Sequence, residues 1–156
     1  MSEKTLLVLF LWIGENNAPY ICALCIGHLF MTKKIIKKDA TALLLDSIVF
    51  GMQERKAKDI VVMDLRKIDH AMTDYFVICH GTSTTQVQSL AQSVEEQTMR
   101  LSNEKPLHIE GQRNSNWILM DYVNVIVHVF ETSARTNYSL EELWSDGLIE
   151  HIASQD

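Results

Sequence analysis

The residues best suited to chemistry lie in a polar segment where an expected strand gives way to a helix. This segment reads Gly81-Thr-Ser-Thr-Thr85, and its backbone N–H groups and hydroxyls could hold a phosphate at the start of the helix. It lacks the lysine of a P-loop and the three glycines of a dinucleotide-binding turn. Ser, Thr and Gly also favour helix capping regardless of function. Capping is therefore the simpler interpretation, and phosphate binding is the alternative.

A strand, a Gly-Thr turn and a helix are also typical of nucleotidyltransferases, which hold two metal ions with paired acids that follow the turn. The later segments offer His108-Ile-Glu110, then Asp121 and Glu131. No Asp-x-Asp or Asp-x-Glu pair follows the turn on a strand, so two-metal phosphoryl transfer lacks its usual ligands. That activity would need ligands that converge from separate strands.

The other candidate ligands and nucleophiles are scattered along the chain. Cys22 and Cys25 have the spacing of half a zinc site, and no second cysteine pair completes it. His128, between two valines, is typical of a packed strand residue. No serine, histidine and acid can be combined into a triad from their spacing. We therefore expect no catalytic residue, metal ligand or cofactor-binding residue. The other histidines considered are His70, His80 and His108.

The composition fits one globular domain. The chain has 156 residues, of which 47% are hydrophobic and 22% charged, and a formal net charge of −6. These values argue against a disordered chain and against extensive direct binding of nucleic acid. From Glu110 to the end, the chain contains eight acidic residues and only two arginines. This part is therefore expected to repel phosphates and to attract a basic protein. The odd count of three cysteines favours free thiols in a reducing, cytoplasmic compartment.

Residues 1–30 differ from the rest of the chain. Their apolar runs, Leu6 to Ile13 and Tyr20 to Phe30, are too short and too interrupted for a membrane span of roughly 20 residues. The leading Met-Ser-Glu-Lys is not basic, unlike the start of a signal peptide. Met31-Thr-Lys-Lys reads like the start of a cytosolic protein. We interpret residues 1–30 as an upstream extension and residues 31–156 as the working domain, with no membrane association.

Hydrophobic periodicity predicts the elements that position these residues. A helix is expected from Asp39 to about Lys56, with an apolar stripe that must cover a sheet. Strands follow at 59–65 and 73–80, and the continuous apolar run of the first indicates an interior strand. Ser83 and Gln86 match a capping box that opens a helix to about residue 101. The stripe of the first helix consists of Leu44, Ile48 and Met52.

The second half of the chain is richer in strands. A short strand is expected at 107–110, and a β-hairpin spans 116–130. Ser139 and Glu142 match a second capping box, which predicts a last helix that ends near Gly147. The order is helix, strand, strand, helix, three strands, helix. This order predicts a single α/β layered domain with a mixed sheet of about five strands flanked by helices.

The hairpin is the most informative stretch. Alternation with period two places its first-arm side chains on two faces that are both largely apolar. Either helices cover both faces, or one face stays open and meets a partner, because an exposed Trp beside Leu with an acid at the rim is typical of interfaces. One face carries Trp117, Leu119 and Asp121, and the other carries Ile118, Met120 and Tyr122.

Seven segments of the chain together match the pattern of one protein family. They are Asp59-Ile-Val-Val-Met-Asp-Leu65, Thr73-Asp-Tyr-Phe-Val-Ile-Cys79, Gly81-Thr-Ser-Thr-Thr-Gln-Val87, His108-Ile-Glu-Gly111, Trp117-Ile-Leu-Met-Asp-Tyr122, Val125-Ile-Val-His-Val-Phe130 and Leu140-Glu-Glu-Leu-Trp144. In their order and spacing, over about residues 38–147, they resemble the Iojap family, the ribosomal silencing factor RsfS. The resemblance implies a nucleotidyltransferase-like α/β fold without established transferase activity.

The resemblance further implies a cytoplasmic, non-enzymatic translation repressor without a cofactor. Members bind the large ribosomal subunit through large-subunit ribosomal protein fourteen. They block association with the small subunit and repress translation under nutrient limitation. Organelle relatives act in ribosome assembly, so a large-subunit assembly factor is one alternative, and a nucleotidyltransferase-like enzyme that uses residues 81–85 is another. Relatives also self-associate, which makes a homodimer an open alternative to a monomer.

The resemblance assigns partner binding to the first arm of the hairpin, namely to Trp117, Leu119, Met120, Asp121 and Tyr122. The chain departs from the family at the tip. Relatives often have Gly at position 123, where this chain has Val123. Valine disfavours positive φ, so we expect a longer or flatter connection than a tight type I′ turn.

Overall fold

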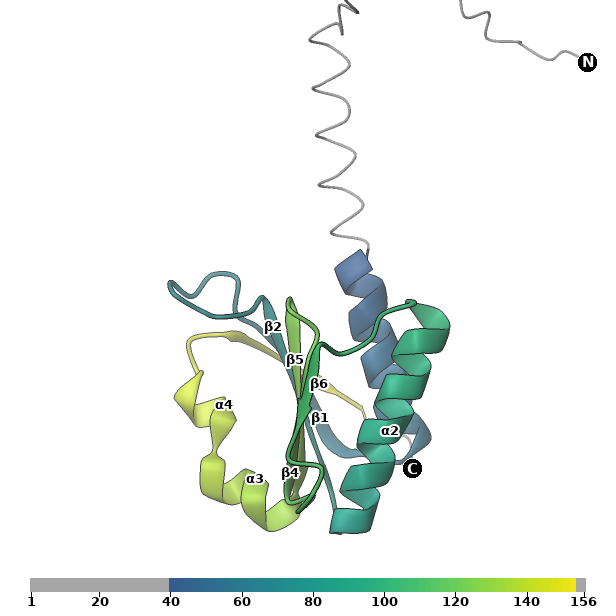
Figure 1. The fold of residues 1–156 in the computed structure, drawn as a ribbon. Helices are drawn as coiled ribbons and strands as arrows, with labels where there is room; N and C mark the ends of the chain where they lie inside the picture. The colour runs from purple at the N-terminus through teal and green to yellow at the C-terminus, as the bar shows by residue number, and fades with distance from the viewer. Residues whose placement is uncertain (1–39, 154–156) are drawn as a thin grey trace, which may run out of the picture.

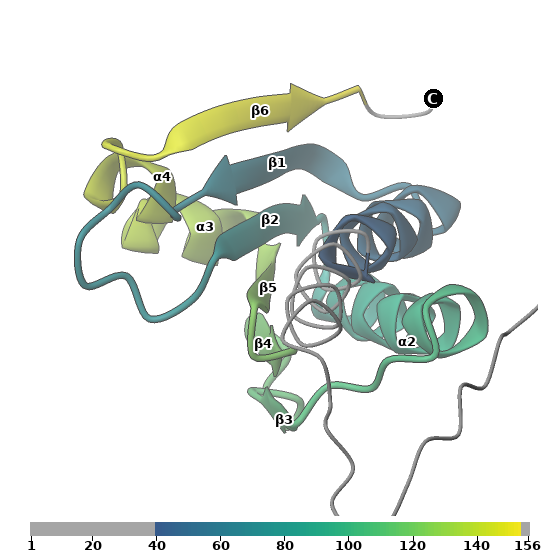
Figure 2. The same ribbon diagram turned by 90° about the horizontal axis from the view of Figure 1, so that it is seen from above.

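The centre of the fold is a six-stranded mixed sheet with the strand order β3-β4-β5-β2-β1-β6. The computed structural model describes residues 40–153, so the apolar runs of residues 1–30, the Cys22 and Cys25 pair and the Asp39 cap lie outside the described residues. Among the strand pairs of the described residues, only β2 and β5 are parallel, and β6 and β3 form the two edges (Figure 2). The strands are β1 (Lys58–Asp64), β2 (Tyr75–Gly81), β3 (His108–Glu110), β4 (Trp117–Asp121), β5 (Val125–Glu131) and β6 (Leu148–Ile152).

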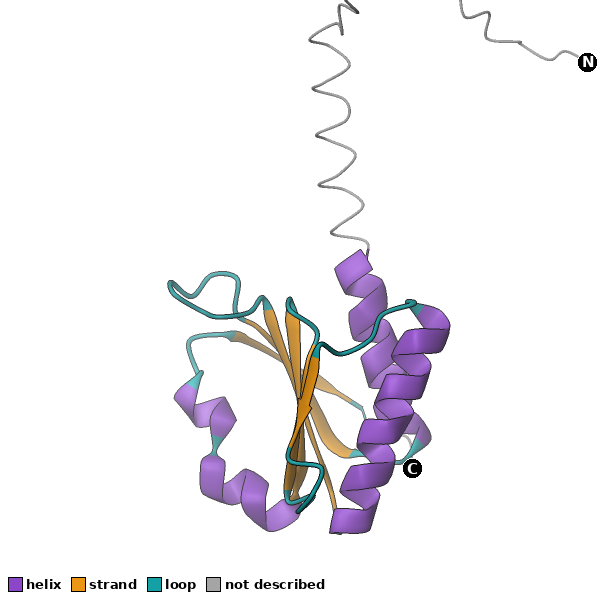
Figure 3. Cartoon of the chain, viewed as in Figure 1, coloured by secondary structure: helices purple, strands orange, loops and turns teal. Residues whose placement is uncertain are grey.

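Two long helices cover one face of the sheet (Figures 1 and 3). They are the first helix, described over residues 40–54, and α2 (Thr84–Leu101). The predicted stripe of the first helix is buried, because Leu44 is 5% exposed and Ile48 and Met52 are 0% exposed. These side chains meet the inner face of α2 and one face of β1, β2, β4 and β5 in the larger core cluster. The predicted α/β layering is therefore confirmed.

The passage from β2 into α2 follows the predicted cap in part. Ser83 is the N-cap, and its hydroxyl accepts a hydrogen bond from the Gln86 backbone N–H at 3.2 Å. Gln86 does not return a bond to Ser83. Its Oε1 accepts from the Thr82 N–H at 2.8 Å, and its amide donates to the Arg55 carbonyl at 3.2 Å. The side chain thereby ties the end of the first helix to the start of α2.

The other face of the sheet carries two short helices, α3 (Thr132–Tyr138) and α4 (Leu140–Leu143) (Figure 1). The predicted capping box at Ser139 is wrong. Ser139 joins the two helices in the left-handed conformation, with φ 41° and ψ 50°, and its hydroxyl donates to the Thr136 carbonyl at 2.9 Å instead of capping α4. The last helix ends at Leu143 rather than near Gly147. The chain then forms β6, the sixth strand, which pairs antiparallel with β1.

The hairpin of β4 and β5 turns tightly around Val123. The Asn124 N–H donates to the Tyr122 carbonyl at 2.9 Å, and Val123 has φ 74°, which together form a γ-turn with a positive central φ. The Asp121 carboxylate accepts from the Val123 N–H at 2.7 Å. The type I′ turn is absent, as expected, but the expected longer or flatter connection is wrong because local hydrogen bonds hold a tight one.

Candidate functional site

Three of the predicted binding residues lie together on one face of β4. Trp117, Leu119 and Asp121 are all partly exposed, and their burial alternates with that of the residues between them. We call these three residues the Trp117 patch. They lie on the face that carries α3 and α4, but α3 packs mainly on β5 and β2. The short helix therefore leaves the face of β4 partly open.

The other two predicted binding residues lie behind the patch. Met120 is 0% exposed and Tyr122 is 6% exposed, and both belong to the core under the long helices. The Tyr122 hydroxyl forms a hydrogen bond with the Thr98 hydroxyl at 3.0 Å, and burial raises the pKa of Tyr122 to about 12. The pleat that exposes Trp117 turns these two side chains inward. They fix β4 in place and do not form part of the open surface.

The Trp117 indole is held by aromatic neighbours. Its ring stacks on Phe130, its cross-strand neighbour on β5, with the centroids 5.0 Å apart and an angle of 22° between the planes. Tyr138, at the end of α3, lies 4.7 Å from the indole centroid and is 56% exposed. The partly exposed Trp117 and the exposed Tyr138 thus form an aromatic pair that packs on Phe130. The sequence reasoning did not single out Tyr138 or Phe130, although Phe130 faces Trp117 once the hairpin register is fixed.

A buried histidine completes the support of the indole. His128 is 4% exposed, and its Nδ1 accepts a hydrogen bond from Trp117 Nε1 at 3.2 Å. Its ring also packs perpendicular to Phe76, with the centroids 4.9 Å apart. Burial lowers the pKa of His128 to about 4, so the imidazole is neutral at pH 7. The expectation of a packed strand residue is confirmed.

Polar groups on β3 form the rim of the patch. In the antiparallel register, Glu110 lies opposite Leu119 and His108 lies opposite Asp121, so these side chains share the face of the patch. Both β3 residues are exposed. The rim of the Trp117 patch is therefore acidic, with Glu110 and Asp121 as its carboxylates, and it favours a partner that carries Arg or Lys.

The polar segment after β2 serves a structural purpose in the described residues. Ser83 and Thr82 are occupied by the bonds that start α2. Next to it, Arg135 of α3 donates to the Asp59 carbonyl at 2.7 Å, to His80 Nδ1 at 2.9 Å and, through Nε, to Glu141 at 2.9 Å. Burial and the adjacent Arg135 charge lower the pKa of His80. These contacts engage the Arg135 guanidinium and hold α3 and α4 against β1 and β2.

The three acids considered for two-metal chemistry do not all converge, because Glu131 lies apart from Glu110 and Asp121. Asp121 pairs with Ile126 near the start of β5, whereas Glu131 lies at its end. The Glu131 carboxylate accepts from the Ser133 N–H at 2.9 Å, and these bonds at the start of α3 lower its pKa. No group of three or more His, Cys, Asp or Glu residues within 40–153 is placed to hold a metal ion.

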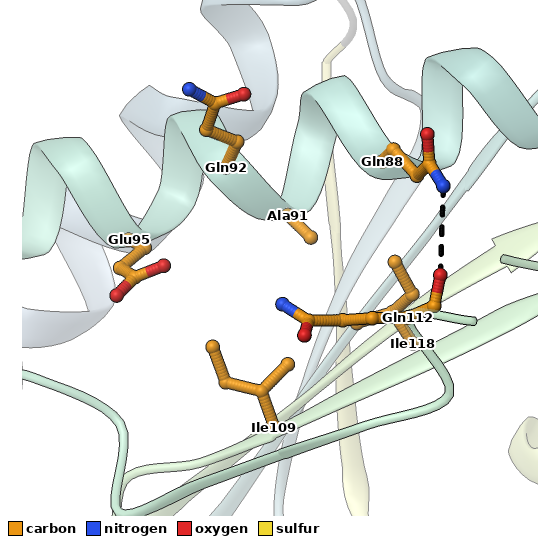
Figure 4. A pocket seen from close by; sticks show the side chains of 7 residues that line it. All are labelled: Gln88, Ala91, Gln92, Glu95, Ile109, Gln112 and Ile118. Atoms are coloured by element: carbon orange, nitrogen blue, oxygen red, sulfur yellow. Dashed lines mark hydrogen bonds between the residues drawn. The ribbon is translucent and has the colours of Figure 1, made fainter.

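A separate pocket of about 360 Å³ lies between α2 and the strands β3 and β4. Figure 4 shows amide side chains around an apolar floor, and the Gln88 amide reaches the Gln112 carbonyl at 3.5 Å. The lining offers one carboxylate, that of Glu95, and no histidine, cysteine, serine or threonine. The lining residues are Gln88, Ala91, Gln92, Glu95, Ile109, Gln112 and Ile118. In the described part of the chain, no helix is both long and apolar enough to cross a membrane.

Comparison with known proteins identifies close relatives and similar folds. The chain is 35% identical over 119 residues to the ribosomal silencing factor RsfS of Bacillus subtilis, covering 74% of this chain and 90% of the relative. It is 28% identical over 103 residues to mitochondrial assembly of ribosomal large subunit protein 1 of Mus musculus, covering 65% of this chain and 45% of the relative.

Two crystal structures share the fold. One, from Bacillus halodurans, has a TM-score of 0.57 and 34% identity and covers 65% of this chain and 92% of its own. Another, from Chromobacterium violaceum, has a TM-score of 0.59 and 25% identity and covers 76% and 88%, respectively. The family model described as "Ribosomal silencing factor during starvation" matches residues 37–156. These matches confirm the resemblance seen in the sequence, and the chain belongs to the RsfS family of ribosomal silencing factors.

Proposed function

We propose that this protein binds the large ribosomal subunit through the Trp117 patch and blocks association with the small subunit, so that translation is repressed under nutrient limitation. The partner is large-subunit ribosomal protein fourteen, and the protein acts in the cytoplasm without catalysis. The observation that carries the proposal is a partly exposed tryptophan on a rigid strand, bordered by acids, in a chain of the RsfS family.

The chemistry of the patch suits a protein partner with a basic surface. Trp and Tyr dominate the energetics of many interfaces because they bury a large area with few rotatable bonds. Trp117 and Tyr138 supply such anchors, and Leu119 adds apolar area between them and the rim. Glu110 and Asp121 attract Arg or Lys. Met120 and Tyr122 contribute from behind, because they hold β4 against the helices.

Repression then follows from steric exclusion. A domain docked on the joining face of the large subunit occupies space that the small subunit needs. No bond is made or broken in this mechanism, so it needs no metal, cofactor or general base. The negative charge of the domain also disfavours contact with ribosomal RNA and directs binding to a protein surface.

Replacing Trp117 tests the proposal. We expect Trp117→Ala to weaken binding to purified large subunits by about 1–3 kcal/mol, or roughly 5- to 150-fold in Kd, because it removes the central anchor. Binding is measured by co-sedimentation, and subunit joining by sucrose-gradient profiles. Leu148→Ala is the matched control, since Leu148 is 69% exposed on β6, at the opposite edge of the sheet. Normal subunit joining at saturating wild-type protein, without co-sedimentation, would disprove the proposal.

A role in large-subunit assembly is the second candidate, favoured by the name of the murine relative. The same patch would hold the protein on a precursor of the large subunit. In cells that lack the protein, this role predicts precursor particles during unrestricted growth, whereas silencing alone predicts a defect only when nutrients are scarce. The homodimer implied by the family resemblance stays a prediction.

A further inference from the structure

His128 is unusual among the histidines of the described chain because its side chain is buried. It is 4% exposed, in the middle of β5 and directly opposite Leu119 of the Trp117 patch. Phe76 and Phe130 pack against its ring. Apolar side chains of similar size would fill this place without a desolvation cost. The presence of a polar ring therefore calls for a specific contact.

That contact is the hydrogen bond to the indole. The Trp117 Nε1–H is a donor only, so the 3.2 Å contact requires that His128 Nδ1 be the unprotonated acceptor. The proton of the neutral ring then sits on Nε2, which has no hydrogen-bond partner among the described residues. One nitrogen is left unsatisfied while the other holds the indole. Burying a donor without a partner costs free energy, so the hydrogen bond to the indole is the contact that accounts for a polar ring at this position.

The hydrogen bond to His128 determines the orientation of the Trp117 indole ring. Stacking on Phe130 fixes the plane of the Trp117 ring, but the same plane is compatible with a ring turned so that its N–H points to solvent. A single acceptor on the buried side selects one of these orientations. Tyr138 contacts the indole in this orientation, with the two ring centroids 4.7 Å apart. Preorganised aromatic anchors bind more tightly because less rotamer freedom is lost on docking.

We propose that His128 is the positioning residue of the Trp117 patch, and that its Nδ1 holds the indole in the orientation that docks on the ribosomal partner. This inference rests on the proposed function. His128, a buried residue of β5, thereby contributes to recognition of the partner, although it forms no part of the exposed surface.

Two substitutions at His128 and one at Trp117 test the proposal. His128→Leu removes the acceptor, whereas His128→Asn keeps an oxygen acceptor near the position of Nδ1. We expect His128→Leu to weaken binding to purified large subunits about 10-fold, and His128→Asn to restore most of this loss. Trp117→Phe removes the indole N–H, so adding His128→Leu to it should produce little further loss. His151→Asn, an exposed histidine on β6, controls for the loss of one imidazole.

A second measurement uses the protein alone. In ¹⁵N NMR spectra, the Trp117 indole N–H, assigned with Trp117→Phe, should exchange slowly in the wild type and in His128→Asn, and rapidly in a folded His128→Leu variant. If His128→Leu does not fold, His128→Asn tests the proposal instead. The proposal requires that His128→Asn bind large subunits as the wild type does and protect its indole N–H from exchange to the same extent.

The outcomes separate this inference from the proposed function. Equal binding by wild type and His128→Leu, additive losses in the double variant, or slow indole exchange without the acceptor would each overturn the role of His128. Failure of the wild-type protein to bind large subunits would overturn the proposed function, and with it the docking role of the indole.

Discussion

Of the described non-glycine residues with positive φ, Val123 is the one with a β-branched side chain. It has φ 74° and is 59% exposed, and positive φ is rare and costly for a β-branched residue. Two contacts hold it there: the Asp121 carboxylate accepts from its N–H at 2.7 Å, and the Thr73 hydroxyl donates to its carbonyl at 3.2 Å. The strain is therefore compensated locally, next to a residue of the Trp117 patch.

We expect Val123→Gly to raise the free energy of unfolding by about 1 kcal/mol. Relief of a positive-φ conformation is worth about 1–3 kcal/mol, and the greater freedom of glycine in the unfolded chain offsets roughly 0.5–1 kcal/mol of it. Urea denaturation of both proteins measures the difference. Val123→Ala is the matched control, because it removes the branch but keeps a Cβ at positive φ, and it should recover less stability. Equal or lower stability of the glycine variant would show that the turn is not strained.

At the same scale, alternation along the sequence placed Trp117, Leu119 and Asp121 on one face, because a strand fixes which neighbours share a side. It could not show that Met120 and Tyr122 would be buried, since both faces looked apolar. The sequence identified His128 only as a packed strand residue, without its contact to Trp117, and it did not single out Tyr138. The contact of His128 depends on the register of β4 against β5, and Tyr138 reaches Trp117 only because of a helix that the sequence pattern did not indicate.

Among the elements, those with long periodic patterns were predicted well and those with weak patterns were missed. The first helix, α2 and the interior strands bury continuous stripes or faces, which leave a clear signal in sequence. In contrast, α3 has seven residues and buries only Ala134, so it shows no stripe. β6 is an edge strand with Glu150 and His151 exposed. Pairing with β1, rather than its own composition, makes it a strand.

Gly51 tests the packing of the two long helices. An added Cβ at this position would lie 2.8 Å from the Val94 Cα on α2, closer than real contacts allow. Alanine favours helix formation, yet we expect Gly51→Ala to lower the free energy of unfolding by about 1–3 kcal/mol, because backbone must shift to admit the methyl group. Thermal and urea denaturation measure the change. Asp46→Ala, on the exposed side of the same helix, is the control and should leave stability unchanged or raise it slightly. The same result for Gly51→Ala would contradict the close approach of the two helices at Gly51.

At the scale of the whole molecule, charge and shape act together in the proposed docking. The chain carries a formal net charge of −6, and the Trp117 patch adds local acids to that overall field. An acidic domain approaching a basic surface associates faster than a neutral one, and salt screens this gain. The aromatic residues, in contrast, act only at contact and govern the lifetime of the complex. The two contributions can therefore be separated by kinetics.

We expect Asp121→Lys to slow association with large subunits several-fold and to reduce the salt dependence of the association rate, with a smaller effect on dissociation. Asp46→Lys is the matched control, because it changes the net charge by the same two units on the first helix, on the sheet face opposite the patch. Stopped-flow or surface-binding kinetics at several salt concentrations measure both rates, and thermal denaturation checks that losing the Asp121 bond to Val123 leaves the domain folded. Slower association by Asp121→Lys alone indicates local steering at the Trp117 patch. Equal slowing by both variants would mean that only net charge matters, and would argue against this face as the docking surface.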